Sequence, residues 1–130
     1  MVLIDSSAWV EYLRDTGSPE HRAAAAAVAD GTAATTDAVL LEILVGTASV
    51  ALARVARLLE NQHFLAQEPI LDARAAADIY QTCRREGVTP RSPVDCLIAA
   101  VAIREGVSLL HRDRGFESIA RCVPLVVADT

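Results

Sequence analysis

The chain has 130 residues, which is the size of one domain, and we expect residues 1–130 to fold as a single unit. Hydrophobic residues make up 52% of the chain and charged residues 22%, a balance that excludes an intrinsically disordered protein. The 17 acidic residues outnumber the 12 basic ones, all Arg, so the net charge of −5 argues against a protein that binds nucleic acid through overall positive charge.

Short apolar segments alternate with helical segments along the chain. In chain order, the predicted elements are a strand at 2–4, helices at 8–14 and 19–29, a strand at 33–36, helices at 38–46 and about 49–61, a strand at 64–66, helices at 72–86 and 92–105, a strand at 107–111, a short helix at 116–120 and a strand at 124–127. The expected N-terminal helix caps are Ser6 or Ser7, Ser18, Asp37, Asp72 and Ser92.

This alternation favours an α/β fold with three α/β/α layers. Its central sheet is expected to be short and mostly parallel, with four to five strands and helices on both faces. Ligands of such sheets bind at the carboxyl ends of the strands. Residues that directly follow the strands are therefore the first candidates for a functional site.

No segment has the character of a membrane span or an export signal. The longest apolar runs, residues 23–29 and 97–103, have seven residues each, whereas crossing a bilayer takes roughly 20. The first residues lack the basic region and apolar segment of a secretory signal, so we expect a cytoplasmic protein with no membrane partner. Cys83, Cys96 and Cys122 are odd in number and far apart, which favours simple thiols over disulfides or zinc ligands.

Four acidic residues occupy unusual positions, although each has an ordinary alternative role. Asp5 and Asp113 each follow a predicted strand, where they could also be a helix cap and a solvated loop acid. Glu42 interrupts an apolar helix, where an ionised carboxylate is costly unless it is paired or sits on a thin exposed stripe between Leu41 and Val45. Asp95 is the third residue of its helix, where an acid can also complete a capping box.

A doubly wound sheet can bring these four carboxylates to one cleft. Carboxylates that lie close together repel one another, and a hard divalent cation with oxygen ligands compensates that repulsion. Mg²⁺, with Mn²⁺ as a substitute, is therefore the expected cofactor. Apart from these four acids the chain is nearly neutral, so its overall acidity does not argue against a nucleic-acid ligand.

The segments that carry these acids resemble PIN-domain ribonucleases, and more closely the VapC-type toxins of VapBC toxin–antitoxin pairs. The resemblance covers nearly the whole chain and rests on residues 2–9 (VLIDSSAW), Glu42, residues 91–100 (RSPVDCLIAA) and residues 111–116 (HRDRGF). It implies a PIN-like fold. It also implies a Mg²⁺-dependent endoribonuclease that hydrolyses phosphodiester bonds of tRNA or rRNA and so inhibits translation.

Carried over residue by residue, the resemblance implies that Asp5, Glu42, Asp95 and Asp113 form the metal-binding and catalytic set, with Ser7 supporting Asp5. The three Asp residues are expected to supply most ligands, directly or through water. Glu42 is expected to complete the site through a water or a second metal, and to position the water that attacks phosphorus.

Two positions depart from the family pattern. Many relatives carry a second acid where this chain has Gly115, which leaves Asp113 as the only acid of that loop that fits. Many also have Ser or Thr where His111 stands, and we expect the His111 imidazole to donate a hydrogen bond in place of that hydroxyl.

Three Arg residues beside the proposed ligands, Arg91, Arg112 and Arg114, are candidates to hold RNA phosphates, with a solvated surface position as the alternative. Trp9 and Phe116 fit core packing better than base stacking. The resemblance further implies a cognate VapB-type antitoxin whose C-terminal segment obstructs the cleft, often with an Arg that reaches the acids. It also implies a homodimer and a higher toxin–antitoxin assembly.

Two other functions remain open at this point. One is a catalytically silent PIN-like module that binds RNA or protein. The other is a metal-dependent phosphatase with Asp5 as the nucleophile; such sites usually have a second Asp at the position of Ser7 and a Lys, and this chain has neither.

Overall fold

The computed structural model describes residues 1–130. Its first strand, β1 (Val2–Ile4), lies in the middle of a parallel sheet whose strand order is β3-β2-β1-β4. Its neighbours are β2 (Ala33–Thr35) and β4 (Ser108–Leu110), and β3 (His63–Phe64) extends the sheet beyond β2. The predicted α/β class and the four-stranded parallel sheet are confirmed.

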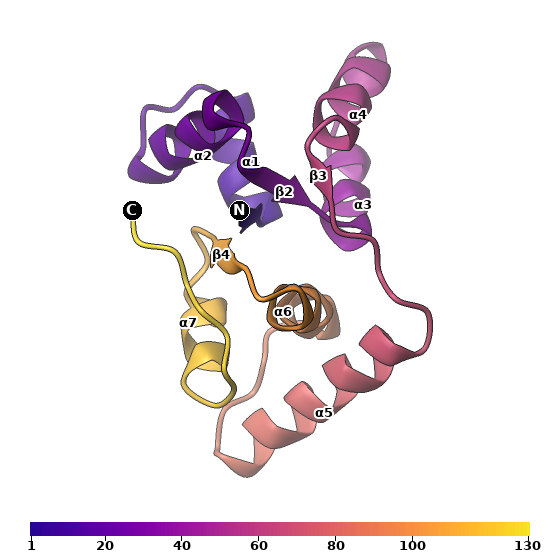
Figure 1. Ribbon diagram of the computed structural model, residues 1–130, viewed down its shortest axis with the longest axis vertical. Coiled ribbons are helices and arrows are strands. Elements are labelled where there is room, and N and C mark those ends of the chain that lie inside the picture. The colour runs from indigo at the N-terminus through magenta and orange to yellow at the C-terminus, as the bar shows by residue number, and fades with distance from the viewer.

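Helices flank this sheet and make up most of the molecule (Figure 1). They are α1 (Ser6–Leu13), α2 (Pro19–Asp30), α3 (Asp37–Val45), α4 (Leu52–Glu60) with a preceding 3₁₀ turn η1 (Ser49–Ala51), α5 (Leu71–Arg85), α6 (Pro93–Glu105) and α7 (Arg114–Ala120). Figure 1 shows α6 between β4 and α5, so that α5 forms an outer edge of the molecule. None of these helices is long and apolar enough to span a membrane.

Three predicted caps differ in the structure. Asp5, not Ser6 or Ser7, caps α1. Its side chain accepts the Ser7 N–H, and it is the single residue between the end of β1 at Ile4 and the start of α1 at Ser6. Thr36 precedes α3, and the predicted cap Asp37 instead accepts the backbone N–H of Gln67. Asp72 lies inside α5, where it binds Arg104 rather than capping the helix.

The predicted last strand at 124–127 is wrong. Only Val127 forms a bridge, and its partner is Leu109 of β4. In this bridge the Leu109 N–H donates to the Val126 carbonyl, and the Ala128 N–H donates to the Leu109 carbonyl. Proline at position 124 has no N–H to contribute to a ladder, and Val126 is largely exposed. The segment therefore touches the edge of the sheet without extending it.

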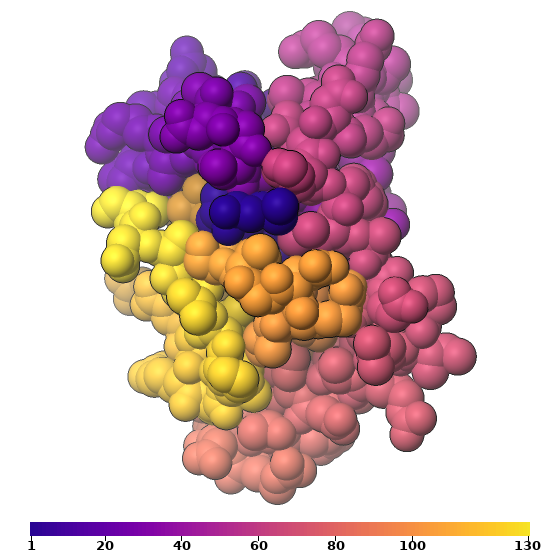
Figure 2. All heavy atoms as spheres, viewed as in Figure 1, coloured from indigo at the N-terminus to yellow at the C-terminus, as the bar shows by residue number.

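The core forms around β1, whose Leu3 and Ile4 are completely buried. Figure 2 shows the N-terminal residues in indigo enclosed by segments from other parts of the chain, which agrees with the pairing of β1 with β2 and β4. Trp9 and Phe116 are also fully buried, so they act in packing and are not available to stack on a base. Burial of both faces of the sheet fixes the positions of the residues that follow its strands.

A buried ion pair joins α5 to α6. Both oxygens of Asp72 accept hydrogen bonds from Arg104, each at 2.9 Å, and Arg104 also donates to the Ala66 carbonyl. The Arg104 hydrogen bonds are the main reason why the pKa of Asp72 lies below its usual value. Asp72 therefore contributes stability at neutral pH that is lost as the pH falls through its folded-state pKa.

We expect Arg104→Met to destabilise the fold by about 3 kcal/mol at pH 7, because it leaves the buried Asp72 carboxylate without its cation and with only the Glu68 N–H as a donor. Denaturant unfolding measures this change. Glu105→Gln is the matched control, since it removes only the more exposed partner of the same Arg and is expected to cost less than about 1 kcal/mol. Equal effects of the two substitutions would contradict the prediction.

Candidate active site

Asp5 and Ser7 connect the end of β1 to the start of α1. The Oδ2 atom of Asp5 accepts hydrogen bonds from the Ser7 hydroxyl at 2.6 Å and the Ser7 N–H at 3.1 Å. The Ser7 hydroxyl oxygen in turn accepts the Arg112 N–H at 2.9 Å, and the Asp5 N–H donates to the Leu110 carbonyl. Ser7 thus fixes the Asp5 carboxylate and ties it to the loop after β4.

The loop after β4 presents Asp113 at the start of α7. Asp113 caps this helix by accepting the Gly115 N–H at 2.9 Å, and its own N–H donates to Nδ1 of His111 at 3.0 Å. His111 is buried, and its Nε2 atom has no hydrogen-bond partner. The imidazole therefore accepts a hydrogen bond instead of donating one as expected, and it holds the backbone from which Asp113 projects.

Asp95 lies on the first turn of α6 and is only 2% exposed. Arg91 places its guanidinium between two acids, 3.4 Å from Asp95 Oδ2 and 2.5 Å from Asp113 Oδ2. Burial raises the pKa of Asp95 to about 6 despite the opposing effect of Arg91, and Asp5, Asp113 and Glu42 raise it further. The four acids are thus close enough to influence one another electrostatically.

Glu42 projects from α3, and its Oε1 atom accepts a hydrogen bond from the Ser6 hydroxyl at 3.0 Å. The residue is exposed, and Leu41 and Val45 are 64% and 79% exposed, so the expectation of a thin exposed stripe is wrong. Partial loss of water around its carboxylate still raises the pKa of Glu42, the Ser6 hydrogen bond lowers it, and Asp5 raises it. Sequence analysis missed Ser6 because its partner is 36 residues away.

A cleft of about 520 Å³ opens over these side chains, and its lining includes Asp5, Glu42, Asp113 and Arg91. No three His, Cys, Asp or Glu side chains are arranged to hold an ion directly, and the Arg91 guanidinium compensates Asp95 and Asp113 instead. Carboxylate oxygens are the ligands that Mg²⁺ prefers. Three of the acids line this cleft, and the buried Asp95 lies outside its lining but close enough to be repelled by them. The chemistry of these donors therefore suits a divalent cation, and in this structure the Arg91 guanidinium occupies the space between Asp95 and Asp113.

A fifth carboxylate is absent at Gly115. A Cβ atom at this position would lie 3.3 Å from Asp113 Oδ1 and 3.9 Å from Asp95 Oδ2. An acidic side chain there would therefore start beside Asp113 and Asp95, which both contact Arg91. In this chain the position contributes only the N–H that Asp113 accepts.

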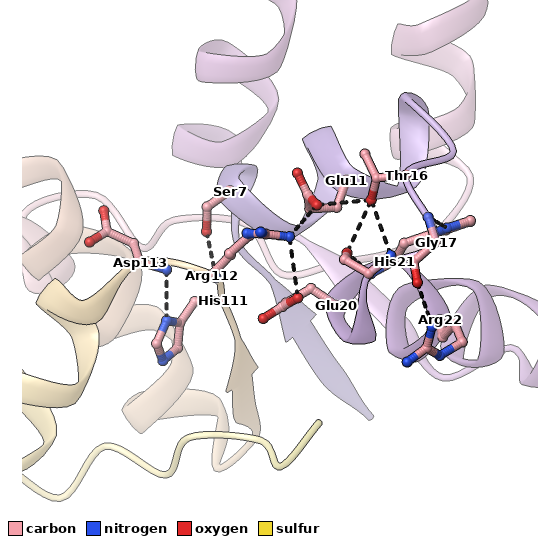
Figure 3. Close-up of polar contacts among 11 residues, drawn as sticks. Ser7, Glu11, Thr16, Gly17, Glu20, His21, Arg22, His111, Arg112 and Asp113 are labelled. Carbon is pink, nitrogen blue, oxygen red and sulfur yellow. Dashed lines mark hydrogen bonds and ion pairs between the residues drawn. The ribbon is translucent and has the colours of Figure 1, made fainter.

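The three candidate Arg residues diverge. Arg91 lines the cleft, whereas Arg112 turns to Glu11 and Glu20, on the side of the loop opposite to Asp113 (Figure 3). Arg114 lines a separate hollow near Arg112 and the end of the chain. The structure therefore brings one of the three together with the acids. It adds Arg14, at the end of α1, which lines the same cleft and which sequence analysis did not single out.

Comparisons with known proteins agree on one family. Residues 2–121 match the PIN domain family. The chain is 42% identical to the VapC ribonuclease Mb1587 of Mycobacterium bovis and 42% identical to ribonuclease VapC11 of Mycobacterium tuberculosis, over 98% of both chains in each case.

Solved structures show the same fold at lower identity. The crystal structure of VapBC2 from Rickettsia felis, bound to a DNA fragment from its promoter, contains a chain with a TM-score of 0.77 and 14% identity, covering 100% of this chain and 99% of that one. The sarcin–ricin loop cleaving toxin VapC20 of Mycobacterium tuberculosis gives a TM-score of 0.64 and 21% identity, covering 97% and 99%. The match over residues 2–121 and the 42% identity over nearly the full length show that the chain belongs to the VapC branch of the PIN-domain family.

Proposed function

We propose that the protein is a metal-dependent endoribonuclease that acts as the toxin of a toxin–antitoxin pair. The observation that carries this proposal is the gathering of Asp5, Glu42 and Asp113 around one cleft in a chain of the VapC family, with the buried Asp95 joined to Asp113 through Arg91. RNA is the proposed substrate because the similar full-length proteins are named ribonucleases. The proposed targets are tRNA or rRNA, whose cleavage would inhibit translation, and the proposed location is the cytoplasm.

The proposed metal ligands are Asp5, Asp95 and Asp113, with Glu42 at the opposite wall of the cleft. A bound Mg²⁺ or Mn²⁺ would lower the pKa of a water and polarise the phosphoryl oxygens. Ser7 holds Asp5 in place through the two hydrogen bonds described above. Glu42, whose pKa is raised, would accept a hydrogen bond from the attacking water and orient it, while Arg91 would leave Asp113 and bind the phosphate.

The proposed partner is a VapB-type antitoxin. The fold is shared with chains of VapBC complexes, and Arg91 shows that a guanidinium fits between Asp95 and Asp113. An Arg or similar base from an antitoxin would compensate the same carboxylates and obstruct the cleft. A homodimer is also proposed, and gel filtration at several protein concentrations tests it.

We expect the purified protein to cleave a structured RNA with Mg²⁺ or Mn²⁺, to lose cleavage in EDTA, and to regain it when the metal is restored. Metal dependence follows because the carboxylates alone cannot neutralise a phosphodiester. Gel analysis of the fragments, beside release of phosphate from a small phosphomonoester, measures both activities. Binding without cleavage would favour the silent module, phosphate release alone would favour the phosphatase, and cleavage in EDTA would contradict metal dependence.

A further inference from the structure

We propose that Arg14 binds a second phosphate of the RNA strand, at the end of the cleft away from the acids. This inference rests on the proposed ribonuclease function. The cleft would then hold the RNA backbone at two places, near the reacting phosphate and at Arg14.

The cleft extends beyond the acids along two helices. On α1 its lining runs from Ser6 and Ser7 through Val10 to Arg14. The eight residue steps from Ser6 to Arg14 correspond to about 12 Å at a helical rise of 1.5 Å per residue. A single phosphate group cannot contact both ends, so a ligand that fills the cleft must be extended.

The other helix along the cleft, α3, also runs from an acidic residue to an end that carries no acid. On α3 the lining runs from Glu42 through Ile43 to Gly46 and Thr47, just past the helix end. One end of the cleft is therefore acidic, and the other combines a guanidinium with a partly exposed Thr and apolar side chains. A cation with neutral neighbours suits a phosphodiester, whereas the acidic end requires a cation of its own.

Arg14 is exposed and its guanidinium forms no ion pair or hydrogen bond in the structure. Arg91, Arg104 and Arg112 each pair with at least one acid. Glu11 stands one turn before Arg14 on the same helix, but it is already paired with Arg112. Arg14 can therefore bind a phosphate without first breaking an ion pair.

A base at a helix C-terminus has an ordinary explanation, because it complements the helix dipole. That role requires only that Arg14 lie near the end of α1. It does not require the side chain to line the same cleft as Asp5 and Asp113, which it does. The shared cleft favours RNA, the ligand of the acidic end, over an acidic segment of a protein partner.

The test measures RNA affinity in the cleavage-deficient Asp5→Asn background, with a short fluorescein-labelled single-stranded RNA and increasing salt. Each phosphate contact contributes about −0.7 to the slope of log affinity against log salt for a single strand. We expect Arg14→Ala to flatten the slope by about 0.7 and to weaken binding at low salt by about three- to tenfold. Arg14→Lys should restore the slope, since it keeps the charge.

Arg74→Ala is the matched control, because Arg74 is exposed on α5, outside the cleft, and should leave the slope unchanged. In the active protein, Arg14→Ala should raise KM with little change in kcat, because Arg14 lies far from the reacting phosphate. An unchanged slope or no RNA binding by the Asp5→Asn protein would overturn the inference. So would a result in which Arg14→Ala weakens the binding of an acidic peptide, measured in the same way, but leaves the affinity for RNA unchanged. Cleavage by the parent protein tests the proposed function separately.

Discussion

Replacing Asp95 with Asn is expected to stabilise the metal-free protein above pH 7 while it abolishes RNA cleavage. The Asp95 carboxylate is buried beside three other acids, and its pKa is raised from 3.8 to about 6. Ionisation of this group therefore opposes folding. Asn keeps the size and the first-turn position in α6 but carries no charge.

The sign follows from proton binding. Between pH 3.8 and about 6 the folded protein binds more protons at Asp95 than the unfolded protein does, so stability falls as the pH rises through this window. Above this window the ionised Asp95 carboxylate lowers the free energy of unfolding by its full amount. The difference of about two units between its unfolded and folded pKa corresponds to about 3 kcal/mol. Asp95→Asn and the parent should thus be equally stable near pH 4 and differ by about 2–3 kcal/mol at pH 8, with Asn the more stable.

Unfolding by urea in EDTA, repeated across this pH range, measures the difference. Asp78→Asn, at an exposed position of α5, is the control and should change stability by less than about 0.5 kcal/mol at every pH. Millimolar Mg²⁺ or Mn²⁺ should stabilise the parent and leave Asp95→Asn unchanged, because a ligand stabilises only the state that binds it. Parallel pH profiles for the parent and Asp95→Asn would show that Asp95 carries no such cost.

Asp5→Asn is expected to abolish cleavage without loosening the fold. Asp5 accepts two hydrogen bonds from Ser7 at the start of α1, and the amide oxygen of Asn can accept both. The cap of the helix is therefore kept, whereas the charge offered to a metal is lost. We expect cleavage to fall by more than about 100-fold, beyond the loss typical of residues that only support a ligand.

Single-turnover cleavage of the same RNA, beside a thermal melt in EDTA, measures both effects. Asp30→Asn is the matched control, since Asp30 ends α2 at an exposed position and lies outside the cleft. Loss of folding in Asp5→Asn would mean that the carboxylate charge itself holds the end of β1. Full activity of this variant in Mg²⁺ would remove Asp5 from the proposed ligand set.

The regular elements were largely predictable because their signals are local. Ser18 with Pro19 marks the start of α2, and Ser92 with Pro93 marks the start of α6. Gly31 and Gly106 end the same helices in the left-handed conformation that glycine adopts without strain. The errors at Asp37, Asp72 and residues 124–127 arose where a distant partner or the edge of the sheet overrides the local signal. At the start of α1 the cap is Asp5 instead of the predicted Ser6 or Ser7.

The candidate site likewise has features that follow from local sequence and features that depend on distant partners. The sequence alone determined which acids follow β1 and β4 and which acid opens α6, because strand ends and helix starts are read from neighbouring residues. Only the tertiary structure decided that Ser6 binds Glu42, that Arg112 turns away to Glu11, and that Arg14 shares the cleft with the acids. The physical reason is reach: these contacts join side chains of separate helices and loops, and the packing of those elements, which no local pattern encodes, sets which charges meet.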